Sequence, residues 1–262
     1  MNLVALCADI MPAIGHIGHE IWLRSGDSMV LQIKEKSAGD VATQIDLWAE
    51  NELKAMLLKA LPGSQFLGEE TGGALTDAPT WIVDPIDGTA NFARGYPQWS
   101  MSIALAIEGQ PVLGVVHDPN RQEMFYACQG QGAWLQSRRG LQRLHCASVS
   151  EPLQATVATV FPKPLSLLMQ PYLRELEIVL RSAGQVRRSG SMALELAYVA
   201  AGWADAFWER GMQSWDAAAG MVLLQEAGAQ IVALDELPVL QSQCLAAGSP
   251  AMLEQLLSLL KV

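Results

Sequence analysis

The sequence lacks a long apolar run and has few charged residues. Asp, Glu, Lys and Arg make up 17% of the 262 residues, and 50% are hydrophobic, whereas an average soluble protein has about 25% charged residues. The uncharged stretch from Leu237 to Leu253 contains Pro238, Pro250 and several polar side chains, so it falls short of the roughly 18 apolar residues that mark a membrane-spanning helix. The composition excludes a disordered chain, and we expect no membrane association.

Basic residues are scarce. The chain has 17 Lys and Arg against 27 Asp and Glu, which gives a net charge of -10. No block of basic residues could follow a phosphate backbone, so we expect no direct binding to nucleic acid. The first basic residue is Arg24, so no positively charged region precedes an apolar segment as in a secretory signal, and we expect a cytoplasmic protein.

Cysteine is also rare and unpatterned. Cys7, Cys128, Cys146 and Cys244 lie far apart and match no Cys-x-x-Cys or Cys/His spacing. This distribution predicts reduced thiols and excludes a structural zinc site of the usual kind.

Hydrophobic periodicity predicts an α+β first half and an alternating α/β second half. In the first half we expect helices over 4–24 and 46–61, strands over 29–33, 64–68 and 81–83, and an antiparallel meander over 100–107, 111–117, 123–128 and 133–136. In the second half we expect strands over 155–161, 185–188, 206–209 and 230–233, helices over 165–182, 192–202 and 215–227, and a final strand and helix within 244–261. We place a boundary near Ser150, which divides one compact unit into lobes 1–150 and 151–262.

The segment Trp81–Asn91 reads WIVDPIDGTAN. A buried strand delivers Asp84, Asp87 follows three residues later, and Gly88 and Thr89 open a short helix. Each Asp-Pro or Asp-Gly pair alone is a common turn signal. Two carboxylates at a strand end, followed by the free N–H groups of a helix start, instead combine a hard-cation site with a phosphate cradle.

Two further acidic segments repeat this chemistry. Glu69 and Glu70 follow a predicted strand, and Asp216 opens a predicted helix in the sequence WDAAAG. Alone, Asp216 would favour the positive end of the helix dipole and the Glu pair would be a solvated edge. Because the three motifs contain hard oxygens and no His or Cys, they favour Mg²⁺ or Mn²⁺ over zinc. Such cations would also reverse the local charge that repels a phosphate monoester from this acidic protein.

The motifs GEE, DPIDGT and WDAAAG, in this order, resemble those of the metal-dependent, lithium-sensitive inositol monophosphatase superfamily, and the resemblance runs over nearly the whole chain. It is closest to bacterial inositol-1-monophosphatases of the SuhB type, as the segments 36–46 (KSAGDVATQID) and 186–228 indicate. The resemblance implies a layered αβαβα sandwich of the inositol monophosphatase and fructose-1,6-bisphosphatase type. It also implies a homodimer, which agrees with the apolar composition.

The resemblance assigns roles to particular residues. The implied ligands of two or three Mg²⁺ ions are Glu69, Asp84, the carbonyl oxygen of Ile86, Asp87 and Asp216. One ion would activate a water molecule and the other would support the leaving oxygen, with no covalent phosphoenzyme. The implied catalytic residues, which accept the proton of the water, are Glu69, Thr89 and Asp46. The implied substrate-binding residues are Gly88, Thr89, Glu209, Ser191 and Met192, whereas Glu70 has no ligand role.

The substrate implied by the resemblance is inositol 1-phosphate or a similar small polyol phosphate. Met192 stands where relatives usually have a small residue, and Trp99 stands where a small or aliphatic residue is frequent; core packing and substrate selection are both open for these positions. Sibling enzymes act on histidinol phosphate, fructose 1,6-bisphosphate or 3′-phosphoadenosine 5′-phosphate, and such a substrate is the alternative. A non-catalytic regulatory protein on the same fold is the second alternative, although it would have no reason to keep several repelling carboxylates at one site.

Overall fold

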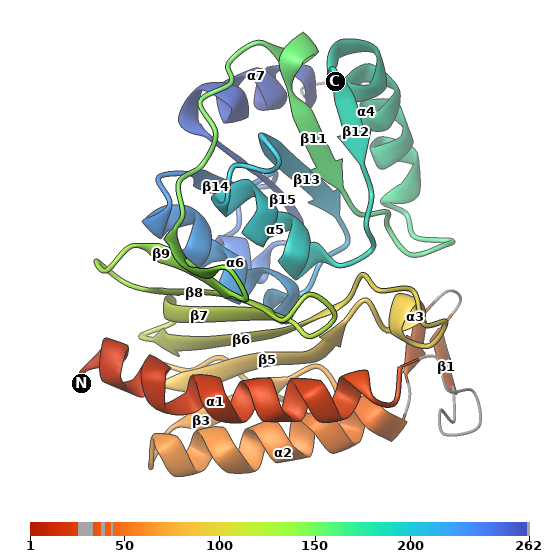
Figure 1. The fold of residues 1–262 in the computed structure, drawn as a ribbon. Coiled ribbons are helices and arrows are strands. Elements are labelled where there is room, and N and C mark those ends of the chain that lie inside the picture. Colours follow the sequence, from red (N-terminus) through yellow and green to blue (C-terminus); the bar gives the residue numbers. More distant parts are fainter. Residues whose placement is uncertain (26–33, 38–39, 43, 261–262) are drawn as a thin grey trace.

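The computed structural model describes residues 1–25, 34–37, 40–42 and 44–260. The chain forms five layers, with three pairs of helices separated by two sheets (Figure 1). The helices are α1 (Leu3–Trp22) and α2 (Gln44–Ala60) on the outer face of the large sheet, α5 (Met192–Ala200) and α6 (Ser214–Glu226) between the sheets, and α4 (Met169–Ser182) and α7 (Pro250–Leu260) on the outer face of the small sheet. The predicted αβαβα sandwich is therefore confirmed.

The large sheet has eight strands in the order β10-β9-β8-β7-β6-β5-β3-β4. Their bounds are β3 (Gln65–Gly68), β4 (Gly72–Gly73), β5 (Thr80–Asp87), β6 (Ser100–Ile107), β7 (Gln110–Asp118), β8 (Glu123–Cys128), β9 (Ala133–Ser137) and β10 (Gly140–Arg143). All adjacent pairs are antiparallel except β3 and β5, so the predicted meander is confirmed. The sequence did not predict β4, which consists of two glycines, or β10, whose residues are all exposed.

The small sheet has five strands in the order β12-β11-β13-β15-β14. Their bounds are β11 (Thr156–Thr159), β12 (Gln185–Arg187), β13 (Ala206–Arg210), β14 (Gln230–Ala233) and β15 (Cys244–Gly248). β11 ends before the predicted residue 161, and α4 begins at Met169 rather than at 165. Both differences follow from Pro162 and Pro164, which favour extended backbone between the two elements.

The remaining elements are short. A separate hairpin joins β1 (Lys34–Ser37) to β2 (Asp40–Ala42), and the chain also forms α3 (Thr89–Phe92) and the 3₁₀ helices η1 (Pro152–Gln154) and η2 (Val239–Gln241). The strand predicted over 29–33 lies outside the described residues. None of the helices in the described part of the chain combines the length and the apolar composition that a membrane-spanning helix requires.

The core between the sheets is built by both halves of the chain. Phe125 of β8 and Ile82 of β5 belong to the same buried cluster as Leu196 of α5 and Leu223 of α6. The last strand of the large sheet ends at Arg143, and the first strand of the small sheet begins at Thr156. The helices of the second half nevertheless complete the core of the first half. The boundary near Ser150 stays a prediction.

The contact between β7 and α6 leaves no room for a side chain at Gly114. A Cβ atom at Gly114 would lie 2.5 Å from the carbonyl oxygen of Ala219 in α6, whereas one at Gly15 in α1 would meet only the Cε of Met124, at 3.8 Å. We expect Gly114→Ala to lower the free energy of unfolding by about 1–3 kcal/mol, the usual cost of overpacking. Gly15→Ala, the matched control, should raise it by about 0.5–1 kcal/mol because alanine favours the helix. Urea denaturation measures both, and equal effects would contradict this account of the interface.

Candidate active site

The end of β5 places two carboxylates at one edge of the large sheet. β5 is buried along its whole length, and its pairing with β6 shifts register between Asp84 and Asp87. Pro85 lies within this shift, where its missing N–H costs no ladder hydrogen bond. The N–H of Ile86 donates to Asp84 Oδ1 at 2.9 Å, which fixes that carboxylate. The strand predicted over 81–83 therefore extends through both acidic residues.

Gly88 turns the chain sharply from β5 into α3. Its φ of 97° lies in the left-handed region, and a Cβ atom would lie 3.1 Å from the carbonyl oxygen of Gln98 and 3.2 Å from that of Gly190. Both the dihedral angle and the close approach require glycine. The Oγ1 of Thr89, the next residue, lies 3.1 Å from Asp46 Oδ1 and 3.0 Å from the Ile86 carbonyl oxygen. The predicted pairing of Thr89 with Asp46 is thus present in the structure.

The second half of the chain supplies the third carboxylate. Asp216 lies in the first turn of α6, and its Oδ2 accepts a hydrogen bond from the N–H of Gln213 at 2.7 Å. Carboxylate oxygens of Asp84, Asp87 and Asp216 all lie within 4.8 Å of one another. α5 contributes as well, because Asp87 Oδ2 accepts hydrogen bonds from Ser191 Oγ at 2.6 Å and from the N–H of Ala193 at 2.7 Å.

Burial and mutual repulsion dominate the electrostatics of this cluster. Burial, and then the negative charges of Glu69, Asp87 and Asp216, raise the pKa of Asp84 well above its ordinary value. Burial raises the pKa of Asp87 to about 6, although the hydrogen bonds from Ser191 and Ala193 oppose the shift. The pKa of Asp216 is also raised well above its ordinary value, first by burial and then by the charge of Asp87. Adjacent buried carboxylates of this kind are stable as anions when a divalent cation lies between them.

The donor set fits a hard divalent cation. The three clustered residues offer carboxylate oxygens, and the charge of Glu69 reaches each of them. Mg²⁺ and Mn²⁺ prefer such oxygens, whereas zinc sites in proteins usually include His or Cys. The residues present could therefore hold the predicted type of metal.

A glutamate that the sequence analysis did not single out positions the loop after β3. Glu50, on α2, is fully buried and accepts hydrogen bonds from the N–H groups of Glu70, at 2.8 Å, and Thr71, at 2.7 Å. The Glu69 N–H donates to the carbonyl oxygen of Val83 in β5, at 3.2 Å. These contacts hold the segment that carries Glu69 beside β5. The sequence contains one signal of this role: Glu50 lies at helical spacing from Leu53 and Leu57, which places its carboxylate on the buried face of the helix.

The substrate-binding residues proposed from the sequence lie in different environments. Glu209, at the end of β13, is 6% exposed, and its Oε2 has no hydrogen-bond partner among the described residues. Its pKa is raised well above the ordinary value, first by burial and then by the charges of Asp216 and Asp87, so the charges of the carboxylate cluster act on it. The side chain of Met192 is buried in the core between the sheets. Trp99 is fully buried and packs edge-on against Phe92, which favours the core-packing interpretation for this position.

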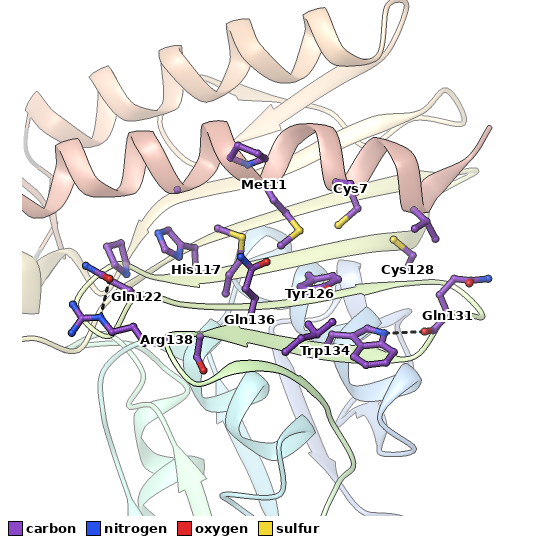
Figure 2. Close-up of a pocket in the computed structure, with 18 of the residues that line it drawn as sticks. Cys7, Met11, His117, Gln122, Tyr126, Cys128, Gln131, Trp134, Gln136 and Arg138 are labelled. Carbon is purple, nitrogen blue, oxygen red and sulfur yellow. Dashed lines mark hydrogen bonds between the residues drawn. The ribbon is translucent and has the colours of Figure 1, made fainter.

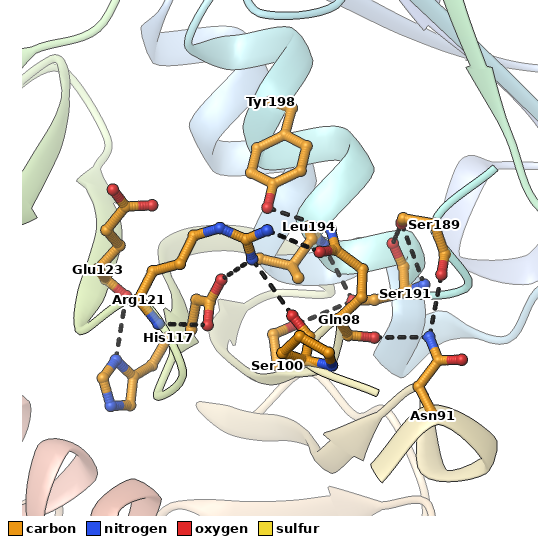
Figure 3. A network of polar contacts seen from close by, with 12 residues as sticks. Asn91, Gln98, Ser100, His117, Arg121, Glu123, Ser189, Ser191, Leu194 and Tyr198 are labelled. Atoms are coloured by element: carbon orange, nitrogen blue, oxygen red, sulfur yellow. Dashed lines mark hydrogen bonds and ion pairs between the residues drawn. The ribbon is translucent and has the colours of Figure 1, made fainter. Parts of the chain in front are cut away.

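Asn91 connects the two loops that flank Gly88, and the sequence analysis assigned it no role. Its Nδ2 donates to the carbonyl oxygens of Gln98 at 2.7 Å and Ser189 at 2.9 Å (Figure 3). Gln98 is held in turn by Arg121, whose Nη2 donates to its Oε1 at 2.9 Å. No sequence pattern identifies such a bridge, because Ser189 lies 98 residues away from Asn91.

Comparisons with known proteins match most of the chain, and all of them indicate the same family. A profile of the inositol monophosphatase family matches residues 8–261. An inositol-1-monophosphatase of Caulobacter vibrioides is 40% identical over 214 residues, 80% of this chain and 82% of that protein. A Xylella fastidiosa protein named Nus factor SuhB is 39% identical over 201 residues, 77% of this chain and 72% of that one. A crystal structure of the extragenic suppressor protein SuhB from Bartonella henselae matches with a TM-score of 0.90 and 33% identity over 98% of both chains. The chain therefore belongs to the inositol monophosphatase family.

Proposed function

We propose that the protein is a Mg²⁺-dependent phosphomonoesterase that hydrolyses inositol 1-phosphate or a similar small polyol phosphate. The observation that carries the proposal is the carboxylate cluster of Asp84, Asp87 and Asp216, with oxygens within 4.8 Å, beside the Gly88-Thr89 turn. Family membership supports phosphatase chemistry at this place. The cofactor is two or three Mg²⁺ ions, with Mn²⁺ as a substitute, held by Glu69, Asp84, the Ile86 carbonyl oxygen, Asp87 and Asp216.

Residues of the chain bind the phosphate, accept the proton of the water and position the metal ligands. Bound Mg²⁺ supplies positive charge that offsets the charge of the phosphate oxygens and of the departing alkoxide. The backbone of Gly88 and Thr89 contacts the phosphate, since the first N–H groups of a helix lack intrahelical acceptors. The Thr89 hydroxyl oxygen lies 3.1 Å from Oδ1 of the buried Asp46. This pair and Glu69 accept the proton that the attacking water loses. Ser191 keeps Asp87 in place by its hydrogen bond of 2.6 Å.

Phosphate release from a panel of monoesters tests the proposal. We expect turnover of inositol 1-phosphate that EDTA abolishes and that Mg²⁺ or Mn²⁺ restores, because the ligands are hard oxygens. We also expect stronger inhibition by Li⁺ than by K⁺ at equal ionic strength, as the family resemblance implies. Full activity in EDTA, or equal responses to the two monovalent salts, would count against the metal assignment.

A pair of matched variants completes this test. Asp84→Asn should remove nearly all turnover, because the charges of Glu69, Asp87 and Asp216 all act on Asp84, which would serve both halves of the metal site. Asp9→Asn, which makes the same change at an exposed position of α1, should have no effect. Retention of more than about a tenth of kcat by Asp84→Asn, a loss below about 1.4 kcal/mol, would contradict the role of Asp84.

Glu209 is the residue to which we assign selectivity for polyols. The charges of the cluster act on its carboxylate, and its Oε2 has no hydrogen-bond partner among the described residues, so it is available to vicinal hydroxyl groups of a substrate. We expect Glu209→Gln to lower kcat/KM for inositol 1-phosphate by about tenfold, roughly one hydrogen bond to a charged group, with little change for an aryl phosphate. Steady-state kinetics on both substrates measure this, and equal losses would instead place Glu209 in the metal environment.

Two other candidate functions remain, and the same experiments distinguish them. A sibling phosphatase would prefer histidinol phosphate, fructose 1,6-bisphosphate or 3′-phosphoadenosine 5′-phosphate in the same panel. The relatives include proteins named inositol-1-monophosphatase and proteins named Nus factor SuhB, so a regulatory role on the same fold is the second candidate. Absence of turnover on the whole panel, in a folded protein supplied with Mg²⁺, would favour that second candidate.

We also propose that the protein forms a homodimer in solution. The loop between β11 and α4 exposes three large apolar side chains, Phe161, Leu165 and Leu167, which are 46%, 92% and 95% exposed. Exposed apolar side chains of this size favour burial against another protein surface. Light scattering should give a mass well above the 28.3 kDa of one chain, and Leu165→Asp with Leu167→Asp should lower it toward that value. The control Leu141→Asp, at a residue 60% exposed on β10, should not. A wild-type mass near one chain at micromolar concentration would refute the dimer.

A further inference from the structure

A cavity of about 1030 Å³ lies between α1 and the strands β7, β8 and β9 (Figure 2). Its lining includes Cys7 and Met11 from α1, Tyr126 and Cys128 from β8, and Trp134 from β9. It contains none of the residues assigned to the active site. Cavities of several hundred Å³ admit small molecules, so reagents can reach the side chains on its wall.

Two of the four cysteines meet in this wall. Cys7 lies in the second turn of α1 and Cys128 ends β8, and Figure 2 shows both side chains in the space between these two elements. The Cys128 thiol donates to the carbonyl oxygen of Leu3, the first residue of α1, at 3.5 Å, which brings its sulfur to the turn of α1 that precedes Cys7. The two thiols also influence each other electrostatically. The two side chains are 2% and 4% exposed, so only a small reagent can approach the sulfur atoms.

The interaction makes the two thiols chemically unequal. The neighbouring Cys7 thiol lowers the pKa of Cys128, although burial opposes the shift. The Cys128 side chain, and then burial, raise the pKa of Cys7. A thiolate is the reactive form of cysteine, so Cys128 is the nucleophile of the pair and Cys7 is positioned to react with it afterwards.

The remaining cysteines differ in each of these respects. Cys146 precedes β11 and Cys244 begins β15, and neither lines the cavity. Burial raises the pKa of both thiols. They serve as internal controls for reactivity.

We propose that Cys7 and Cys128 form a peroxide-reactive thiol pair that closes to a disulfide between α1 and β8. The Cys128 thiolate attacks one oxygen of hydrogen peroxide, the O–O bond breaks, and the departing hydroxide takes up a proton as water, which leaves a sulfenic acid on Cys128. The Cys7 sulfur then loses its proton and attacks the Cys128 sulfur. The S–O bond breaks and a second water leaves. The two thiols lose two protons and two electrons in total, and one peroxide is reduced to two waters.

Peptide mapping of the peroxide-treated protein tests the proposal. The fully reduced protein, treated with one equivalent of hydrogen peroxide, should lose two hydrogen atoms from its intact mass. The digest should contain one linked pair of peptides, carrying Cys7 and Cys128, and a dithiol reductant should restore both. Oxidation of Cys146 or Cys244 ahead of this pair, or no reaction of the pair at all, would overturn the proposal.

Single-cysteine variants separate the two steps. With Cys7→Ser the second step is lost, so a dimedone probe should trap a sulfenic acid on Cys128 that the wild type does not accumulate. With Cys128→Ser the Cys7 thiol should remain unmodified, and with the control Cys146→Ser the Cys7–Cys128 link should form as in the wild type. Trapping on Cys7 instead of Cys128 would contradict the assigned order. If a variant fails to fold, the wild-type map still decides whether the pair forms.

Discussion

The repulsion among buried carboxylates at the junction of the two halves is the constraint on which this architecture depends. Asp84, Asp87 and Asp216 present oxygens within 4.8 Å of one another in an environment that raises the pKa of each. Such an arrangement is costly unless surrounding groups hold the carboxylates and a cation neutralises them. The backbone N–H of Ile86 donates to Asp84, and the Ser191 hydroxyl donates to Asp87, so each carboxylate is held by a hydrogen bond. The stability of the rest of the fold therefore offsets a local cost that a bound divalent cation would reduce.

The layered fold supplies the rigidity that this site requires. β5 is buried along its whole length and ends in the acidic segment, and α6 packs against the same sheet with Asp216 in its first turn. The close approach of Gly114 to Ala219 leaves no space for α6 to move toward the sheet. Since the core between the sheets belongs to both halves, a change in their packing also changes the distances among the carboxylates.

Hydrogen bonds from residues outside the metal motifs position the loops that carry the site. Glu50 fixes the loop that contains Glu69, and Asn91 joins two loops from opposite halves beside Gly88. Neither residue is among the predicted metal ligands or substrate-binding residues. Both act on the site through the loops that they hold, which extends the support of the carboxylate cluster beyond its own residues.

The sequence by itself determined the order of the main helices and strands, the antiparallel meander and the acidic motifs, because these depend on local periodicity and on short spacings. Asp84 and Asp87 are recognisable together since one strand end carries both. Asp216 was assigned to the same site only through the family resemblance, and the tertiary structure brings its carboxylate to theirs. Only the tertiary structure decided that Glu50 holds the neighbouring loop and that Cys128 lies beside the start of α1. These contacts join residues far apart in the chain, and their formation depends on how helices and sheets pack, which no local pattern encodes.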